Sequence, residues 1–196
     1  MEQVLFINCC IRREQSRTQK LADYMMQCLK ELDTYEIKEI CLMDEALQYF
    51  SDGFFLQRER LLEKQDLQHP RFRYAREFAQ ADKIVIAAPF WDLSFPALLK
   101  VYIENLCVEG ITFGYNETGF TGLCWANHMV FLTTRGGFYQ DNPMEMGSRY
   151  LEAMSHFFGI ERYDCIAADG LDAGVRTVEE ILQEAKEKID TLIKTF

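Results

Sequence analysis

Long hydrophobic runs are absent from this sequence. No apolar stretch approaches the roughly 20 consecutive residues that a membrane-spanning helix requires. The first residues also lack the charged segment and following apolar segment that mark a secretory signal. We therefore expect a cytoplasmic protein that does not insert into a membrane.

Basic residues and histidines are scarce. The chain has 21 Lys and Arg against 31 Asp and Glu, a formal net charge of −10. Nucleic acids and anionic membranes are bound through dense Lys and Arg, so neither is expected as the main partner. The three histidines, His69, His128 and His156, are too scattered to indicate a metal site.

Cysteines in the spacings that bind zinc are also missing. The seven cysteines are an odd number and form no paired metal-ligand pattern. We expect reduced, mostly buried thiols, as is usual in the cytoplasm. The neighbouring Cys9 and Cys10 would close only a strained ring, which disfavours a redox role for that pair.

What the chain does contain is an alternation of strands and helices. With 196 residues and 48% hydrophobic content, it is long enough for one domain with a full core, and we predict a single domain over 1–196. Apolar runs predict strands at Val4–Asn8, Tyr35–Leu42, Lys83–Pro89, His128–Thr134 and 163–170. Five strands with intervening helices predict an α/β fold with a parallel sheet covered on both faces.

Helix signals lie between the strands. Ser16 followed by Gln19 predicts a capping box, and Pro96 is expected in the first turn of a later helix. Gly159 closes another helix, and an apolar stripe extends from Val178 to Phe196.

Two segments stand apart from this alternation. Residues 44–82 are long for a crossover, so we expect an excursion around 52–66, mobile or facing a partner, before a helix over 70–80. The stretch ITFGYNETGFTGL predicts a loop or hairpin.

In such a sheet, ligands bind outside the carboxyl ends of the strands, where the strand order reverses. The first loop there, CCIRREQSRT, offers hydroxyls, arginines and the N–H groups of a helix terminus, the parts of a phosphate site. It is neither a GxGxxG loop nor a P-loop. The alternative is that Ser16 only caps the helix and that the arginines are solvated.

The second and third loops are typical of a site for a flat ring. APFWDLSFP places Phe90, Trp91 and Asp92 after the third strand, and TTRGGFYQ places Gly136 and Gly137 after the fourth. The glycines permit close approach of the backbone to a planar ligand. The alternatives are a hydrophobic staple in the second loop and a plain turn in the third. Together the three loops favour flavin mononucleotide (FMN) over NAD, because only one phosphate site is visible.

The order of these motifs resembles the FMN-dependent NADH-azoreductases, flavodoxin-like relatives of the NAD(P)H:quinone reductases. The similarity covers nearly the whole chain and is most specific at Ala87–Tyr102, Gly110–Leu123 and Thr134–Gly137. The resemblance implies a doubly wound sheet in the order 2-1-3-4-5. It also implies FMN as the cofactor, NADH or NADPH as the electron donor and a homodimer with pockets at the interface.

Site residues are carried over from that family by position. Cys10 stands where a serine usually contacts the FMN phosphate, and Ser16, Arg17 and Thr18 match the Ser-x-Ser motif. The residues matched to the flavin ring and its edge are Pro89, Phe90, Trp91, Asp92, Leu93, Thr134, Arg135, Gly136 and Gly137. Tyr115 and Phe157 match aromatics that shape a substrate pocket across the dimer interface.

Two departures from the family pattern bear on the cofactor. Cys10 in place of serine removes one phosphate hydrogen bond, and Asp92 in place of the usual asparagine brings a negative charge toward the flavin. An ionised Asp92 would lower the flavin potential by opposing the charge gained on reduction.

The implied activity is two-electron, ping-pong reduction of quinones, azo compounds or similar acceptors. The cofactor supplies the redox chemistry. The candidate catalytic side chain is Tyr139, which we expect to hydrogen-bond an acceptor or the flavin edge. Three alternatives remain: a flavodoxin-type electron carrier, an FMN-binding module without reductase activity, and a domain of this fold with another ligand.

Overall fold

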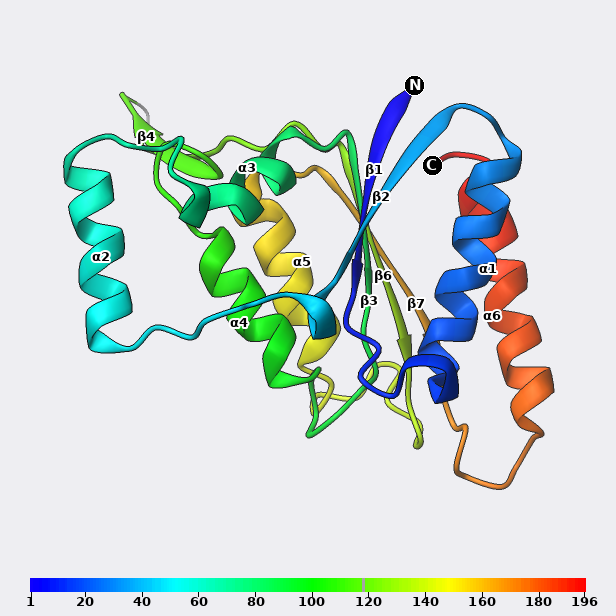
Figure 1. Cartoon of the computed structure of the whole chain (residues 1–196). Coiled ribbons are helices and arrows are strands. Elements are labelled where there is room, and N and C mark those ends of the chain that lie inside the picture. Colours follow the sequence, from blue (N-terminus) through cyan, green and yellow to red (C-terminus); the bar gives the residue numbers. More distant parts are fainter. Residues whose placement is uncertain (118) are drawn as a thin grey trace.

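The computed structural model describes residues 1–117 and 119–196. Its central element is a parallel sheet in the order β2-β1-β3-β6-β7, which is the predicted order 2-1-3-4-5 (Figure 1). The strands of this sheet are β1 (Glu2–Asn8), β2 (Tyr35–Cys41), β3 (Lys83–Ala87), β6 (His128–Thr134) and β7 (Arg162–Ala168). The predicted strand after Gln80 ends two residues early, at Ala87, because the chain turns there into the site loops.

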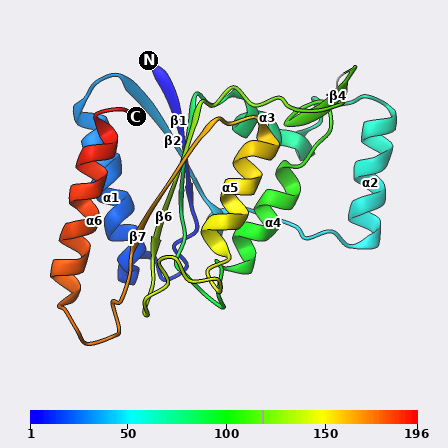
Figure 2. The same cartoon turned by 180° about the vertical axis from the view of Figure 1, so that it is seen from behind.

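Helices cover both faces of the sheet (Figures 1 and 2). On one face lie α1 (Arg17–Glu31) and α6 (Val178–Ile193), and on the other lie α3 (Arg73–Gln80), α4 (Ala97–Leu106) and α5 (Gly147–Phe158). Short 3-10 helices occur at Arg13–Gln15, Leu42–Asp44 and Pro70–Phe72. Helices on both faces are the arrangement that parallel strands demand, since β3 and β6 are buried along their whole length.

Alternating side chains of the strands build two separate cores. Leu5 and Ile7 of β1 point toward α3, α4 and α5, whereas Val4 and Phe6 point toward α1 and α6. The period of two along a strand explains why neighbouring residues belong to different cores. The helices of each face pack onto one of these cores, and most residues of the loops at the strand ends lie outside both.

Two local predictions need correction. Ser16 caps α1 through the N–H of Gln19, but the Gln19 side chain bonds Asn8 and Asp23 instead of closing a capping box. The complete capping box lies in α6, between Thr177 and Glu180.

Pro96 is the residue before α4, not a residue of its first turn. Its φ of −54° and ψ of 141° give an extended backbone that leads into the helix.

The segment 52–66, which was expected to be an excursion, is largely helix α2 (Asp52–Glu63), and this helix lies outside α4 (Figure 1).

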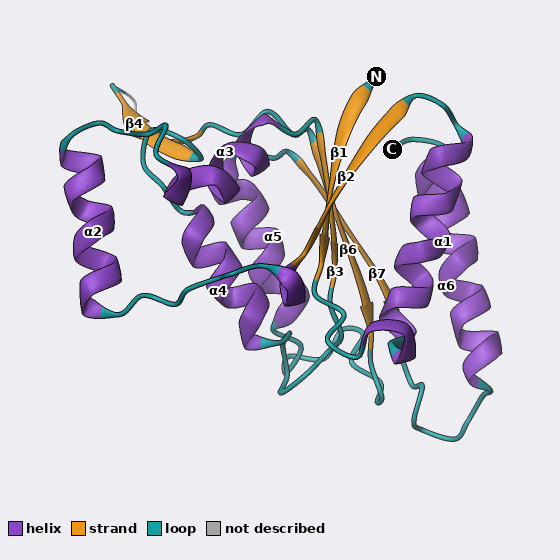
Figure 3. Cartoon of the chain, viewed as in Figure 1, coloured by secondary structure: helices purple, strands orange, loops and turns teal. Residues whose placement is uncertain are grey.

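A hairpin follows α4. Strands β4 (Phe113–Asn116) and β5 (Gly119–Gly122) pair antiparallel, in line with the hairpin alternative for this stretch. The hairpin lies at the opposite end of the molecule from the loops that follow β3 and β6 (Figure 3).

His128 at the start of β6 makes stability dependent on pH. The imidazole is buried, its Nε2 lies 2.8 Å from Asp164 Oδ2, and its ring contacts that of Phe196. Burial lowers the pKa of His128 below its ordinary 6.5. The unfolded chain therefore binds the proton more readily, and the histidine contribution to stability is lost as the pH falls below about 6.5.

We expect urea unfolding at pH 7.5 and pH 5.5 to show this loss. In H128Q the fall in unfolding free energy between the two pH values should be smaller than in the wild type, by at most about 1.4 kcal/mol per pH unit. Replacement of the exposed His156 by Gln is the control. An unchanged pH dependence in H128Q would contradict the assignment.

Candidate functional site

The loops that follow the sheet strands are held together by main-chain hydrogen bonds beyond the strand ends. Phe90 N–H donates to Thr134 O at 3.1 Å, and Arg135 N–H donates to Ala168 O at 2.9 Å. These bonds extend the ladder of the sheet into segments without regular secondary structure. The loops after β3, β6 and β7 therefore form one continuous surface at the carboxyl edge.

This surface and the start of α1 enclose a cavity of about 560 Å³, within the usual range for ligand pockets. Ten of its lining residues were predicted from the sequence as site residues: Ser16, Arg17, Pro89, Phe90, Trp91, Asp92, Leu93, Thr134, Gly136, Gly137. Tyr139, the candidate catalytic residue, also lines it, as do Arg12 and Asp172. Residues from distant parts of the chain thus share one cavity.

One end of the cavity has the character of an anion site. Ser16 caps α1, and the N–H groups of Arg17 and Thr18 lie in the first turn, where a helix offers no internal acceptor. The positive end of the helix dipole adds to this preference for an anion. The Thr18 hydroxyl is fully buried and shares a 2.7 Å hydrogen bond with the Thr134 hydroxyl. This bond connects the start of α1 to the end of β6.

An ion pair crosses the cavity near this end. The Arg17 guanidinium bonds both carboxylate oxygens of Asp172, at 2.7 and 3.0 Å, and holds the pKa of Asp172 below its usual value. A phosphate that approached Arg17 would compete with this carboxylate. Asp172 was missed in the sequence, where its one signal is its place just beyond the fifth strand.

The second loop carries a tight turn at the cavity rim. Trp91 and Ser94 exchange main-chain hydrogen bonds, and the two residues between them have left-handed backbones, with φ of 48° at Asp92 and 67° at Leu93. Positive φ at both central residues is the type I′ pattern, which asparagine and aspartate tolerate better than most residues. Asp92 is therefore compatible with this turn, and its carboxyl group lies in the lining of the cavity.

In the third loop, the backbone of the two glycines lies close to neighbouring side chains. A Cβ on Gly136 would lie 2.6 Å from Asp172 Oδ2, and one on Gly137 would lie 3.1 Å from the Tyr139 ring. Any larger residue would displace these neighbours. The Tyr139 and Phe90 rings lie 4.5 Å apart, so the second and third loops meet as a small aromatic wall.

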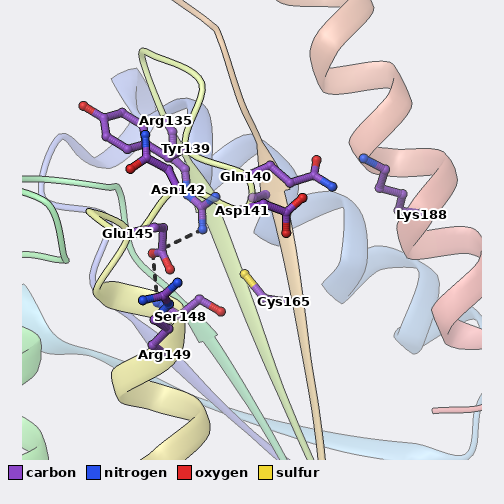
Figure 4. Close-up of a pocket in the computed structure, with 11 residues that line it drawn as sticks. Arg135, Tyr139, Gln140, Asp141, Asn142, Glu145, Ser148, Arg149, Cys165 and Lys188 are labelled. Atoms are coloured by element: carbon purple, nitrogen blue, oxygen red, sulfur yellow. Dashed lines mark hydrogen bonds and ion pairs between the residues drawn. The ribbon is translucent and has the colours of Figure 1, made fainter.

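Arg135 does not line this cavity, in contrast to its predicted place at the flavin edge. Its buried guanidinium turns to the other side of the loop and pairs with Glu145 and Asp169, each at 3.2 Å. There it lines a second cavity, of about 440 Å³, together with Tyr139 and Cys165 (Figure 4). Burial raises the pKa of Cys165 to about 11, so this thiol stays protonated and unreactive.

Cys10 also lies outside the lining of the first cavity. Its side chain is fully buried in the core under α1, and burial raises its pKa to about 12. Cys9 is equally buried, with its pKa raised to about 12, so both are unreactive thiols. The seven cysteines are all free.

Tyr115 and Phe157 lie far from the cavity within one chain. They belong to an aromatic cluster with Phe113 and Phe120, built from the β4–β5 hairpin and α5. Tyr115 is 67% exposed.

Residues 1–117 and 119–196 contain no group of three or more His, Cys, Asp or Glu arranged to hold a metal ion. Among the same residues, no helix combines the length and the apolar character needed to cross a membrane.

Known proteins with similar sequences and structures agree on one family. A family model described as a flavodoxin-like fold matches residues 2–193. FMN-dependent NADH:quinone oxidoreductase 2 of Clostridium acetobutylicum is 40% identical, and the FMN-dependent NADH:quinone oxidoreductase of Clostridium perfringens is 39% identical, each over all of both chains.

Among solved structures, an azoreductase from Bacillus anthracis superposes with a TM-score of 0.89 at 27% identity over all of both chains. An FMN-dependent NADH-azoreductase from the same species, in complex with FMN, superposes with a TM-score of 0.86 at 26% identity, over 100% of this chain and 99% of that one. The chain belongs to the flavodoxin-like fold family and, within it, to the family of these quinone oxidoreductases and azoreductases.

Proposed function

We propose that this protein is an FMN-dependent oxidoreductase that takes electrons from NADH or NADPH and reduces quinones, azo compounds or similar acceptors. The cavity at the carboxyl edge carries this proposal, because it joins an anion site to an aromatic and glycine wall. FMN has the same two parts, a phosphate and a planar ring. The proposal is supported by relatives whose names state FMN dependence over the full length of the chain.

The phosphate of FMN is placed at the start of α1. Ser16, Arg17 and the first-turn N–H groups would bind it, and Arg12 adds a second cation at the rim. A chain with a net charge of −10 thus presents local positive charge where an anion has to enter. Cys10 and Thr18 lie beneath these contacts, and Cys10 as a neutral thiol contributes no charge.

The flavin ring is placed between the second and third loops. Phe90 and Trp91 offer apolar faces, and the tight turn at Asp92 and Leu93 belongs to the lining of the cavity. Gly136 and Gly137 allow the backbone to approach the ring closely. Pro89 and Thr134 complete the lining at the strand ends.

Bound FMN would supply the two-electron and hydride chemistry. The protein then has to bind the ring, leave one face open and orient the donor and acceptor in turn. Tyr139 lines the cavity and contacts Phe90, so its phenol is suited to hydrogen-bond an acceptor. Successive use of one open face by donor and acceptor predicts ping-pong kinetics.

A homodimer completes the proposed site. Among the described residues, the exposed Tyr115 and Phe120 form an aromatic surface together with Phe157. We assign this surface to the dimer interface, where Tyr115 and Phe157 of the partner subunit would border the substrate pocket. Seven free cysteines accord with the reducing environment of the cytoplasm.

The activity can be tested directly. The purified protein should bind FMN and show the visible spectrum of a flavoprotein. It should also oxidise NADH with a quinone or azo dye in parallel-line, ping-pong kinetics. Retention of FMN without NADH oxidation would indicate an electron carrier, and failure to bind FMN would exclude the reductase.

Asp92 should lower the reduction potential of bound FMN. D92N retains the left-handed turn but removes the charge, so we expect the two-electron potential to rise by on the order of 10–20 mV, as for an exposed charge near the ring. D141N is a matched control, because Asp141 also has a left-handed backbone, with φ of 58°, but does not line the first cavity. An equal shift in both variants would argue against a specific role for Asp92.

The dimer proposal predicts a linked loss of assembly and activity. Tyr115→Asp should place a charge in the proposed interface, convert the protein from dimer to monomer in sedimentation experiments and reduce acceptor turnover at least tenfold. Thr191→Asp, at an exposed position of α6, is the control for an added charge. A wild-type monomer with full activity would refute this part of the proposal.

A further inference from the structure

The third loop, whose Gly136 and Gly137 form one wall of the cavity, is hydrogen-bonded to the segment that follows β7. Gly170 N–H donates to Gly137 O at 2.9 Å, and Asp172 N–H donates to Gly136 O at 2.9 Å. Gly170 has a φ of 83° and contacts the Phe138 ring so closely that a Cβ would lie 2.5 Å from it. The wall is therefore built on a second loop that contributes little to the cavity surface itself.

Asp169 is the polar centre of this support. Its Oδ2 accepts the main-chain N–H of Tyr139 at 2.8 Å and that of Gln140 at 2.7 Å. Its Oδ1 accepts a hydrogen bond from the Arg135 guanidinium at 3.2 Å. The Asp169 side chain is only 14% exposed, so these contacts are largely removed from competition with water.

The same network reaches the second loop through Arg135. The Arg135 guanidinium also pairs with the buried Glu145 and lies 5.6 Å from the centre of the Phe90 ring. Figure 4 shows Arg135 beside Tyr139 and its interaction with Glu145. One buried charge cluster thus contacts both loops that are proposed to hold the flavin.

We propose that Asp169 is a positioning residue for FMN and substrate binding, an inference that rests on the function proposed above. Asp169 does not line the cavity and acts through Tyr139. Two successive N–H groups form a small concave site that favours an anion, and the Asp169 carboxylate occupies it permanently. The loop is thereby preformed before any cofactor binds.

The test compares D169N with E145Q in the full-length protein. D169N preserves size but leaves one oxygen to serve both the N–H groups and Arg135, so the loop loses its charged acceptor. We expect the Kd for FMN to rise about tenfold, which corresponds to about 1.4 kcal/mol. The visible circular dichroism of saturating FMN should also change shape, because the chiral wall beside the ring has moved.

E145Q is the matched control. It removes a buried carboxylate from the same guanidinium but leaves the bonds of Tyr139 and Gln140 intact. We expect its Kd to rise less than threefold, with wild-type band shape. An unchanged Kd and spectrum in D169N would overturn the proposal, and so would equal changes in both variants, which would indicate loss of buried charge alone.

A second measurement needs neither variant nor cofactor. In the FMN-free wild-type protein, the amides of Tyr139 and Gln140 should exchange with solvent at least a hundredfold more slowly than that of the exposed Gly174, as measured by NMR. Exchange as fast as that of Gly174 would overturn the preformed loop even if D169N fails to fold. This result is independent of reductase activity, so it separates failure of the inference from failure of the proposed function.

Discussion

The site depends on main-chain hydrogen bonding that continues after the strands end. In a parallel sheet all carboxyl ends lie at one edge, and each loop there begins from a fixed strand position. Here Phe90 bonds Thr134, and Arg135 bonds Ala168, so the loops inherit the register of β3, β6 and β7. Residues from 12 to 172 can then line one cavity, although they are distant from one another in the sequence.

The chain as a whole is acidic, but its cavity is lined by both arginines and carboxylates. The net charge of −10 opposes the binding of anions in general, yet Arg12 and Arg17 line the cavity beside the start of α1. Asp172 partly neutralises Arg17, and Asp92 adds a second carboxylate to the lining of the cavity. The proposed phosphate site is therefore local, built from a helix terminus and two arginines against the average charge of the chain.

Sequence patterns predicted regular elements better than the contacts at their ends. The apolar run at His128–Thr134 coincides with β6, because a central parallel strand must be hydrophobic on both faces. The capping box at Ser16 was only half right, because Gln19 has better partners in Asn8 and Asp23. Helix α2 was expected only as an excursion, since its apolar face is weak and no residue in it is fully buried.

Within the site, local sequence likewise predicted the loops but not the direction of each side chain. The order of loops, the aromatic turn and the paired glycines were readable from local sequence. The turn of Arg135 away from the cavity was not, because it is set by Glu145 and Asp169, which are distant in sequence. Asp169 lies at the end of the predicted strand 163–170, but its role could not be predicted there, since it bonds the N–H groups of a loop thirty residues earlier.

The amino-acid sequence by itself determined the alternation of strands and helices, the chemistry of the three loops and the likeness to a flavin-binding family. These follow from periodicity, turn residues and motif order, which are properties of neighbouring residues. Only the tertiary structure decided which side chains face the cavity, which brace it from behind and which lie at the far end of the molecule. Those choices depend on burial and on ion pairs between distant segments, and such contacts exist only once the sheet has brought the loops together.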